Sequence, residues 1–314
     1  MSLRVAYRMV QAPALWALVL GLGLVGCQST QPSPPVPGAE LRGLQVPAYV
    51  PGTTDSTVLP VRVMTYNIRF NRPTDTMWAL RRGCLTSTVR FHQPTVLGIQ
   101  EGQLHQLMDL EATLDGYERI GLGRRSGGGE FNALLYRTGR LELLQKNTFW
   151  LSETPDDPGS QGWDASYLRT ATWARFRDRL TDDVFVVLNT HFDNDGDTAR
   201  VESARLIRGR IGAIAGAAPR VVMGDLNARP DDRPVQMLTG ADAMLHDAMP
   251  ASETPHHGPA STFNGFRPRV LPDRRIDYVL TSPGVRVLRH AHLPDTCGDG
   301  FPSDHLPVVA DLVF

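Results

Sequence analysis

The sequence predicts an α/β domain in which two mixed β-sheets pack face to face as a sandwich, with helices on the outer faces. Short apolar runs typical of β-strands recur through residues 61–314, and helical patterns lie between several of them. Many neighbouring strands are separated by turns too short for a parallel crossover, which takes about a dozen residues. This mixture favours two packed sheets over one doubly wound parallel sheet.

Several predicted strands end just before a polar residue. Residues 61–66 (VRVMTY) lead to Asn67, and residues 184–189 (VFVVLN) end just before His191. The other predicted strands are residues 95–99, 133–136, 141–144, 170–177, 220–223, 276–280 and 307–314. Helices are predicted from apolar spacing and from their place between strands, at residues 78–91, 103–114 and 199–214. Because strand ends are rigid, they can hold polar side chains in register with one another.

The composition is typical of a globular protein and gives no general attraction to polyanions. The 314 residues are 41% hydrophobic and 21% charged, which is enough for a full core. The net charge of -1 excludes a strong overall pull toward nucleic acid or an anionic membrane, although a local basic face is compatible with it.

Three cysteines are too few and too far apart for a disulfide framework. Cys84 lies in a predicted helix and is expected to pack as a small hydrophobic residue. Pairing of Cys84 with Cys297 in an oxidising compartment stays open as the alternative, because it requires close Cα atoms that a sequence does not show.

Residues 1–26 have the pattern of an export signal. Two arginines precede an unbroken apolar run over residues 14–25, shorter than the roughly 20 residues of a membrane span. The run ends in LVGC at residues 24–27, which resembles the lipobox of bacterial lipoproteins. Cys27 is therefore the expected lipidation site, and the alternative is an ordinary signal peptide followed by an incidental cysteine.

Residues 27–60 are rich in Pro, Ser, Thr and Gly and are predicted to be a tether that carries a single domain at residues 61–314. Gln28 after the lipobox cysteine, rather than Asp, matches the sorting signal for the outer membrane of Gram-negative cells. The chain is therefore expected at the cell envelope, as a lipid-anchored monomer on the periplasmic or the surface side.

Polar side chains suited to metal and proton chemistry follow several predicted strands. They are Asn67, Glu101, His191, Asp193, Asp225, Asn227, Asp277, Asp304 and His305. Each alone has a structural explanation, because Asp and Asn favour turns and a lone His is usually a hydrogen-bonded structural residue. Together, carboxylates, amides and imidazoles without a cysteine suit a hard ion such as Mg²⁺ or Mn²⁺. The sequence contains no His-Glu-x-x-His zinc motif, Gly-x-Ser-x-Gly elbow or Gly-rich phosphate loop.

Seven segments resemble, in the same order, the motifs of the endonuclease/exonuclease/phosphatase superfamily. They are TYNIR (65–69), GIQE (98–101), NTHFD (189–193), GDLNA (224–228), STF (261–263), RIDY (275–278) and SDHLPV (303–308). Each motif is weak alone, but the ordered series is specific. Residues 149–173 further resemble a poorly characterised bacterial branch of that superfamily. The resemblance implies the four-layer, DNase I-like form of the predicted sandwich.

The same resemblance implies that the chain hydrolyses a phosphoester by in-line attack of water, with Mg²⁺ or Mn²⁺ as cofactor. Glu101 is the implied principal metal ligand, with Asn67 beside it. Asp304 is implied to be a further ligand or to hold one by a hydrogen bond. The ion would neutralise charge on the phosphate and on the departing oxygen.

The remaining implied roles concern the water and the phosphate. Asp225 is implied to orient or deprotonate the attacking water, and Asn227 to hold the water or a phosphate oxygen. His191 and His305 are implied to donate hydrogen bonds to phosphate as charge develops. Asp277 is implied to fix the tautomer of His305 and to stabilise its protonated form.

Three further residues, Arg169, Glu130 and Tyr136, are implied substrate contacts by analogy, although a surface ion pair or a packing role explains them equally well. The adjacent pair His256 and His257 lies in a Pro/Gly-rich loop and is expected to be solvated rather than to bind metal.

The expected substrate is a phosphomonoester or phosphodiester, drawn from small organic phosphates, phospholipid head groups or nucleic acid. Basic clusters at residues 124–125 and 267–275 fit either a phosphate-binding rim or a solvated face. Two alternatives stay open: an extracellular nuclease, and a non-catalytic envelope binding protein on the same fold, because a fold does not fix a function.

Overall fold

The computed structural model describes residues 59–71, 77–126, 128–240, 243–267, 269–298 and 300–314. The predicted signal peptide, the lipobox with Cys27 and nearly all of the predicted tether lie outside these residues. Among the helices in the described ranges, none combines the length and the apolar character needed to cross a membrane.

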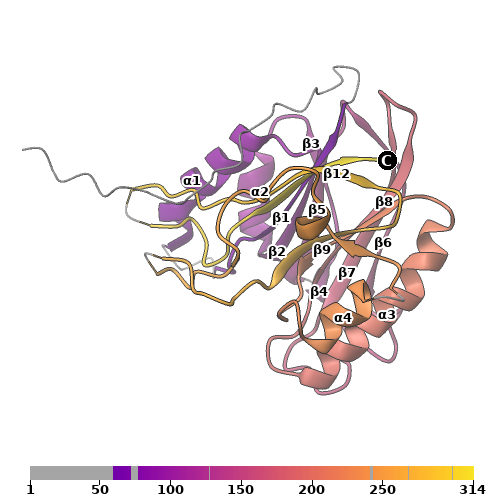
Figure 1. Cartoon of the computed structure of the whole chain (residues 1–314). Helices are drawn as coiled ribbons and strands as arrows, with labels where there is room; N and C mark the ends of the chain where they lie inside the picture. Colours follow the sequence, from indigo (N-terminus) through magenta and orange to yellow (C-terminus); the bar gives the residue numbers. More distant parts are fainter. Residues whose placement is uncertain (1–58, 72–76, 127, 241–242, 268, 299) are drawn as a thin grey trace, which may run out of the picture. The chain divides into compact units, whose positions relative to one another are not determined.

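Helices interrupt the series of strands along the described chain at five places, and β3 to β8 follow one another without a helix between them (Figure 1). The elements are β1 Val61–Asn67, α1 Met77–His92, β2 Val96–Gly102, α2 Leu104–Glu111, β3 Tyr117–Ile120, β4 Gly123–Arg125, β5 Gly128–Arg137, β6 Leu141–Trp150, β7 Thr170–Asp178, β8 Val184–His191, α3 Asp197–Ala215, β9 Arg220–Asp225, α4 Arg233–Thr239, β10 His246–Asp247, α5 Ala248–Ala251, β11 Asp277–Thr281, β12 Arg286–His292 and β13 Val308–Val313.

The strands form two mixed sheets, as the sequence predicts. The first sheet has the order β12-β13-β1-β2-β5-β3, with β4 paired to β5, and the second has the order β10-β11-β9-β8-β7-β6. Each sheet contains one parallel pair, β1 with β2 in the first and β8 with β9 in the second. The other pairs are antiparallel, which explains the short turns in the sequence.

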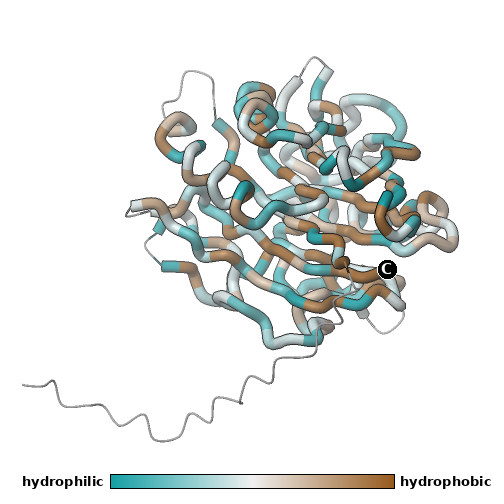
Figure 2. The backbone as a smooth tube through the Cα atoms, turned by 90° about the horizontal axis from the view of Figure 1, so that it is seen from above, coloured by the Kyte–Doolittle hydropathy of each residue, from teal (hydrophilic) through white to brown (hydrophobic). Residues whose placement is uncertain are grey.

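Three apolar clusters separate the layers. The cluster between the sheets includes Val63 and Val308 of the first sheet and Phe176, Val187 and Met223 of the second. A second cluster joins α1 and α2 to the outer face of the first sheet, and a third joins α3 and α4 to the outer face of the second. Figure 2 shows the hydrophobic stretches following the strands. The predicted sandwich with outer helices is therefore confirmed.

Several elements do not follow from apolar patterning. The helix α4 and the strands β3, β4 and β10 are short, and β12 carries arginines and histidines where a strand pattern would show apolar residues. Its buried positions are His290 and His292 as well as the aliphatic Val287. The strand β6, which pairs with β7, is also longer than predicted, and its middle is exposed and polar.

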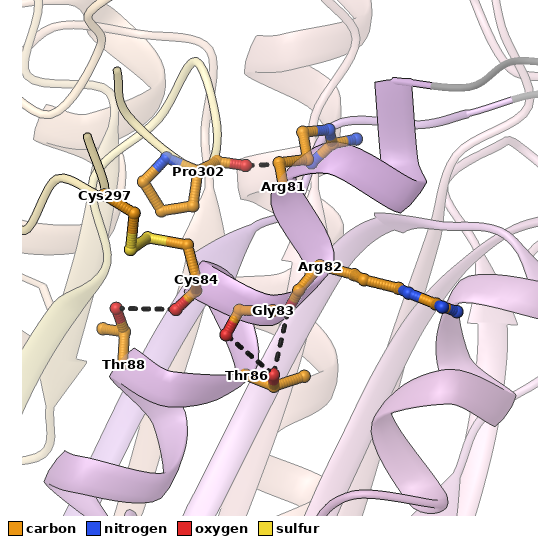
Figure 3. The surroundings of a disulfide bond; sticks show 8 residues. All are labelled: Arg81, Arg82, Gly83, Cys84, Thr86, Thr88, Cys297 and Pro302. Carbon is orange, nitrogen blue, oxygen red and sulfur yellow. Dashed lines mark hydrogen bonds between the residues drawn. A yellow bond between two sulfur atoms is a disulfide. The ribbon is translucent and has the colours of Figure 1, made fainter. Parts of the chain in front are cut away.

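A disulfide joins α1 to the segment that precedes β13 (Figure 3). Cys84 and Cys297 are bonded, with their Cα atoms 5.8 Å apart, although 213 residues separate them in sequence. The expectation that Cys84 packs as a free hydrophobic residue was therefore wrong. One turn earlier in α1, Arg81 donates hydrogen bonds to the carbonyl oxygens of Ile68, Arg69 and Pro302. The helix thus holds the segments that follow β1 and precede β13.

A buried polar bridge connects the two sheets. Asn189 of β8 donates to the carbonyl oxygens of Ile99 and Ala133, at 2.9 Å each, and accepts a hydrogen bond from Gln100. Gly98 makes room for it, because a Cβ there would lie 2.8 Å from the Asn189 side-chain oxygen. These hydrogen bonds fix the position of β8 of the second sheet against β2 and β5 of the first sheet.

Candidate active site

The first sheet brings three of the predicted site segments to one edge. The parallel strands β1 and β2 end together, at Asn67 and just past Glu101. Glu101 has φ of 58° and lies in a bulge, where two residues of β2 face one residue of β5, which turns its side chain toward the site. Because β13 is antiparallel to β1, the segment before it returns to the same edge, and the Ser303 hydroxyl donates to the Asn67 carbonyl at 2.7 Å.

The second sheet contributes the remaining predicted residues. His191 at the end of β8 lies opposite Asp225 at the end of β9, and Asp277 at the start of β11 lies opposite the same Asp225. Asn227 follows with φ of 45°, and its backbone N–H donates to Asp225 Oδ1 at 2.9 Å. The polar residues predicted from strand ends therefore meet across the two sheets.

Asn67 links the two halves of the site. Its side-chain nitrogen donates to Glu101 Oε1 at 3.1 Å and to Asp225 Oδ2 at 3.0 Å, and its side-chain oxygen accepts from the Arg69 backbone N–H at 3.0 Å. The amide oxygen thus accepts from the backbone, while the amide nitrogen orients the carboxylates of Glu101, a predicted metal ligand, and of Asp225.

Two buried carboxylates, those of Glu101 and Asp304, lie on either side of the Arg69 guanidinium. The Arg69 guanidinium lies 3.6 Å from Glu101 Oε2 and 3.7 Å from Asp304 Oδ2, while its own side chain is 43% exposed. Burial opposes ionisation of Glu101, but the Phe70 N–H and the charge of His305 outweigh it and lower the pKa of that carboxyl group. Burial raises the pKa of Asp304. A partly exposed guanidinium between two acids marks a place that suits a hard divalent ion, so these residues fit Mg²⁺ or Mn²⁺.

Asp225 is the central acid of the site. Its Oδ2 lies 3.4 Å from His191 Nε2 and 3.8 Å from His305 Nε2. Burial, followed by the charge of Asp277, raises the pKa of Asp225 to about 7. A carboxyl group with such a pKa can take a proton from water near neutral pH and release it again.

His305 and Asp277 form a buried pair. Nδ1 of His305 donates to Asp277 Oδ2 at 2.9 Å, which leaves Nε2 directed toward Asp225. Burial opposes protonation, but the charges of Asp277 and Asp225 outweigh it and raise the pKa of His305 to about 10. The ring of Phe263 packs edge-on against this imidazole, with the ring centroids 5.0 Å apart. His305 is therefore a protonated donor held in one orientation.

Burial, and then the charge of Arg169, hold His191 in the opposite protonation state. The guanidinium lies 2.9 Å from His191 Nδ1, and a guanidinium can only donate, so Nδ1 accepts and the proton of the neutral ring is on Nε2. This nitrogen faces Asp225 Oδ2 at 3.4 Å and the side-chain amide of Asn227 at 3.0 Å. Burial, and then the charge of Arg169, lower the pKa of His191 well below its usual value. Arg169 is itself fixed by Asp193 and by Asn194, at 3.4 and 2.8 Å. His191 is thus a neutral donor through Nε2. Arg169 affects the site by way of its hydrogen bond to the His191 ring.

A second arginine lies on the same side. Arg124 pairs with Glu130 at 2.7 Å, and the guanidinium groups of Arg124 and Arg169 both lie 5.4 Å from the ring centroid of Tyr167. The charge of Arg124 also lowers the pKa of His191, as does that of Arg69. Glu130 therefore belongs to the surroundings of the site as the partner of Arg124.

Tyr136 does not lie at the site, so its predicted substrate contact was wrong. It pairs with Val96, at the start of β2, whereas Glu101 is at the end of that strand. Its ring packs against Phe176 in the core between the sheets, and its hydroxyl donates to Glu118. A strand that carries residues for the site at one end carries core residues at the other.

Arg69 and Arg124 were not predicted individually as site residues. Arg69 was part of the TYNIR motif, and its φ of 57° two residues beyond Asn67 is the local feature that turns it back to the carboxylates. Arg124 was noted only as part of a basic pair, because its ion pair with Glu130 forms across the turn between β4 and β5.

Residues 64–305 match the Endonuclease/Exonuclease/phosphatase family. This match spans more than half of the chain and contains the whole site described above. The chain belongs to this family. No curated protein matches the chain in sequence.

Solved structures with the same fold support this assignment. A mannosyl-6-phosphatase of Bacteroides thetaiotaomicron is 34% identical, with a TM-score of 0.77, over 81% of this chain and 100% of that one. An endonuclease/exonuclease/phosphatase of Bacteroides vulgatus is 36% identical, with a TM-score of 0.77, over 82% of this chain and 100% of that one. The human nocturnin catalytic domain, at 19% identity and a TM-score of 0.63 over 81% of this chain and 93% of that one, shares the fold.

Proposed function

We propose that this chain is a divalent-metal-dependent hydrolase that cleaves phosphoester bonds at the cell envelope. The observation that carries the proposal is the meeting, across two sheets, of an acid with a raised pKa and two imidazoles in different protonation states. Asp225 lies within 3.8 Å of both His191 Nε2 and His305 Nε2, next to the carboxylates of Glu101 and Asp304.

Each residue has a role that follows from its contacts. Asp225 orients a water molecule and accepts its proton, and Asn227 holds Asp225 through a backbone hydrogen bond. His191 and His305 donate from Nε2 to phosphate oxygens, on which negative charge grows in the transition state. Glu101 and Asp304 would hold Mg²⁺ or Mn²⁺, which supplies charge neutralisation at the phosphate and the departing oxygen.

We further propose a small phosphomonoester as the preferred substrate. Arg124 and Arg169 share the Tyr167 ring beside His191, but their guanidinium groups are paired with Glu130 and Asp193, so the support for a monoester comes from the comparison with solved structures. The likeness to a mannosyl-6-phosphatase at 34% identity supports a sugar phosphate. A panel of mannose 6-phosphate, nucleotides, sphingomyelin, DNA and RNA tests this, and faster hydrolysis of DNA or RNA would favour the nuclease alternative.

Removing the proposed base or the charged imidazole should reduce turnover. Asp225→Asn and His305→Ala are each expected to lower kcat for a nitrophenyl phosphate at least about 10²-fold in Mg²⁺ or Mn²⁺. EDTA should abolish activity in the wild-type protein. The exposed Asp115→Asn and His246→Ala are matched controls and should retain wild-type rates. Unchanged kcat in both site variants would refute the mechanism and leave the binding-protein alternative.

The envelope location rests on Cys27, which lies outside the described residues. In a Gram-negative host, Cys27→Ser is expected to move the protein from the membrane fraction to the soluble fraction, because an acyl anchor needs that thiol. Labelling with a radioactive fatty acid should disappear in parallel. A Cys27→Ser protein that still sediments with membranes and still takes up the label would contradict lipidation.

A further inference from the structure

A second cluster of metal-ligating side chains lies on β12, and no catalytic role above uses it. His290 and His292 are two residues apart on one strand, so they share a face, and both are buried. His256 joins them from the loop that follows α5. The backbone of this loop pairs with β12, because the His257 N–H donates to the His290 carbonyl at 3.1 Å and the His292 N–H donates to the His257 carbonyl at 2.9 Å.

Gly258 allows this close approach. Its φ is 95°, and a Cβ at this position would lie 1.9 Å from the His292 carbonyl oxygen. Any other residue would push the loop away from β12 and carry His256 with it. The expectation that His256 is solvated was therefore wrong, since it is half-buried against two other imidazoles, whereas His257 is exposed.

The three rings are in mutual contact. Ring centroids lie 5.1 Å apart for His256 and His290, 4.5 Å for His256 and His292, and 5.1 Å for His290 and His292. One nitrogen from each ring lies within 4.8 Å of the other two. Nitrogen ligands of a tetrahedral zinc ion are roughly 3.4 Å apart, given Zn–N bonds of about 2.0–2.1 Å.

Two imidazole nitrogens of the cluster have no hydrogen-bond partner among the residues that the structure describes. The Pro259 carbonyl accepts from His292 Nδ1 at 2.7 Å and from His256 Nε2 at 3.2 Å, so both of these nitrogens carry protons. Nδ1 of neutral His256 then accepts from Nδ1 of His290, 2.9 Å away. Nε2 of His290 and Nε2 of His292 remain, both buried and without a hydrogen-bond partner in the described part of the chain.

We infer that a transition-metal ion of the zinc type binds at a site separate from the oxygen-rich active site. Its ligands are Nε2 of His290, Nε2 of His292 and Nδ1 of His256, which exchanges the hydrogen bond that it accepts from His290 for the ion. Neutral imidazoles are ligands for Zn²⁺ and related ions, in contrast to the carboxylates around Arg69. The hydrogen bond from His292 Nδ1 to a backbone carbonyl is the arrangement that orients a metal-bound histidine.

Such an ion would fix the loop that borders a cavity near the active site. This cavity, of ≈ 690 Å³, is lined by Pro259 and Ser261 from that loop and by Arg229 and Arg275. One residue further, the Thr262 hydroxyl accepts the backbone N–H of Asp277 at 3.1 Å. The metal would therefore hold one wall of the cavity against β12.

The test is zinc binding by the purified full-length protein in a large excess of Mg²⁺, after chelator treatment. Titration calorimetry and elemental analysis are expected to show one Zn²⁺ per chain. His290→Gln and His292→Gln should each weaken zinc binding at least about 100-fold. Removing a hydrogen-bond partner of a ligand already costs about 10–100-fold in metal affinity, and removing the ligand itself costs more. The neighbouring His257→Gln is the matched control and should bind zinc as the wild type does. Co²⁺ in the wild type should give the visible absorption of a tetrahedral nitrogen site.

Two results would overturn the inference. One is a wild-type protein that binds no Zn²⁺ under these conditions, which identifies the cluster as packing alone. The other is zinc that survives in the histidine variants and disappears in Asp225→Asn, which places the ion in the active site. Circular dichroism confirms folding, and His256→Gln, changed on the half-buried loop side, should lose zinc even if a β12 variant fails to fold.

Discussion

Arg169 decides how His191 is protonated. Its guanidinium donates to Nδ1 of His191, so the catalytic nitrogen Nε2 carries the proton while the ring stays neutral. His305, in contrast, is kept positively charged by Asp277. The two histidines flank Asp225 with different charges, although a sequence shows only two identical residue types. The difference arises from the second residue that each imidazole contacts.

Replacement of Arg169 tests this control. In Arg169→Met the pKa of His191 should rise, because the charge that helps to depress it is removed, and kcat should fall about 10–100-fold. Imidazole NMR should show His191 titrating at a higher pH than in the wild type. Arg169→Lys is the matched control, since it keeps the charge and should keep the pKa low.

The lowered pKa of His191 also makes the free energy of unfolding depend on pH. A folded-state pKa of His191 below the unfolded value of about 6.5 means that the unfolded chain binds the proton first. Stability from this residue is therefore present above pH 6.5 or so and is lost as the pH falls toward the folded pKa. Urea denaturation should show a smaller loss of stability below about pH 6.5 in Arg169→Met, and an identical pH dependence in both proteins would contradict the assignment.

At the scale of elements, α1 acts as a clamp on two site-bearing segments. Arg81 binds the backbone that follows β1 and the carbonyl of Pro302, and Cys84 is bonded to Cys297. The first contact lies next to Asn67 and the second just before Asp304. Helix α1 carries none of the proposed catalytic groups, yet it fixes the distance between the two segments that supply the predicted metal ligands of the first sheet.

Loss of the disulfide should lower stability. The Cys84→Ser/Cys297→Ser protein is expected to unfold with a free energy lower by about 2–4 kcal/mol, mainly because the unfolded chain regains freedom. Thermal unfolding of the wild type with and without a thiol reductant provides the measurement. The reductant should leave the double-serine protein unchanged, and a wild-type Tm indifferent to reduction would show that the bond contributes nothing.

At the scale of the whole molecule, the site exists only where the two sheets meet. Asn67 and Glu101 come from one sheet and His191 and Asp225 from the other, and they touch through the hydrogen bonds of Asn67. Asn189 ties the sheets together a short distance below. The buried polar residues between the sheets therefore connect fold stability with the geometry of the site.

Asn189→Ala should be strongly destabilising. It removes three buried hydrogen bonds, and we expect the free energy of unfolding to fall by about 2–4 kcal/mol, with a lower kcat in the folded fraction. The exposed Asn147→Ala in the same sheet is the matched control and should stay within about 0.5 kcal/mol of the wild type. Urea denaturation measures both, and equal values would show that the bridge is dispensable.

Much of the fold and of the candidate site could be predicted because both follow from local sequence patterns. Apolar strands followed by Asn67, Glu101, His191 or Asp225 indicate both a sheet edge and its chemistry. What could not be predicted depends on contacts between distant segments. The bond between Cys84 and Cys297 and the packing of His256 on β12 have no local pattern. Tyr136 was misplaced for a related reason, since analogy does not show which end of a strand faces the site.

The disulfide also changes how the molecule would respond to pulling. Cys84 and Cys297 are separated by 213 residues, so a force applied to the two chain ends cannot extend that portion. At about 3.4 Å per extended residue, roughly 700 Å of contour length is withheld until the sulfur–sulfur bond is reduced. Stretching therefore reaches only the segments outside the cysteines, which include Asn67 and His305. Tension would withdraw β1 and β13, two central strands of the first sheet, and disable catalysis while the residues between the cysteines stayed linked.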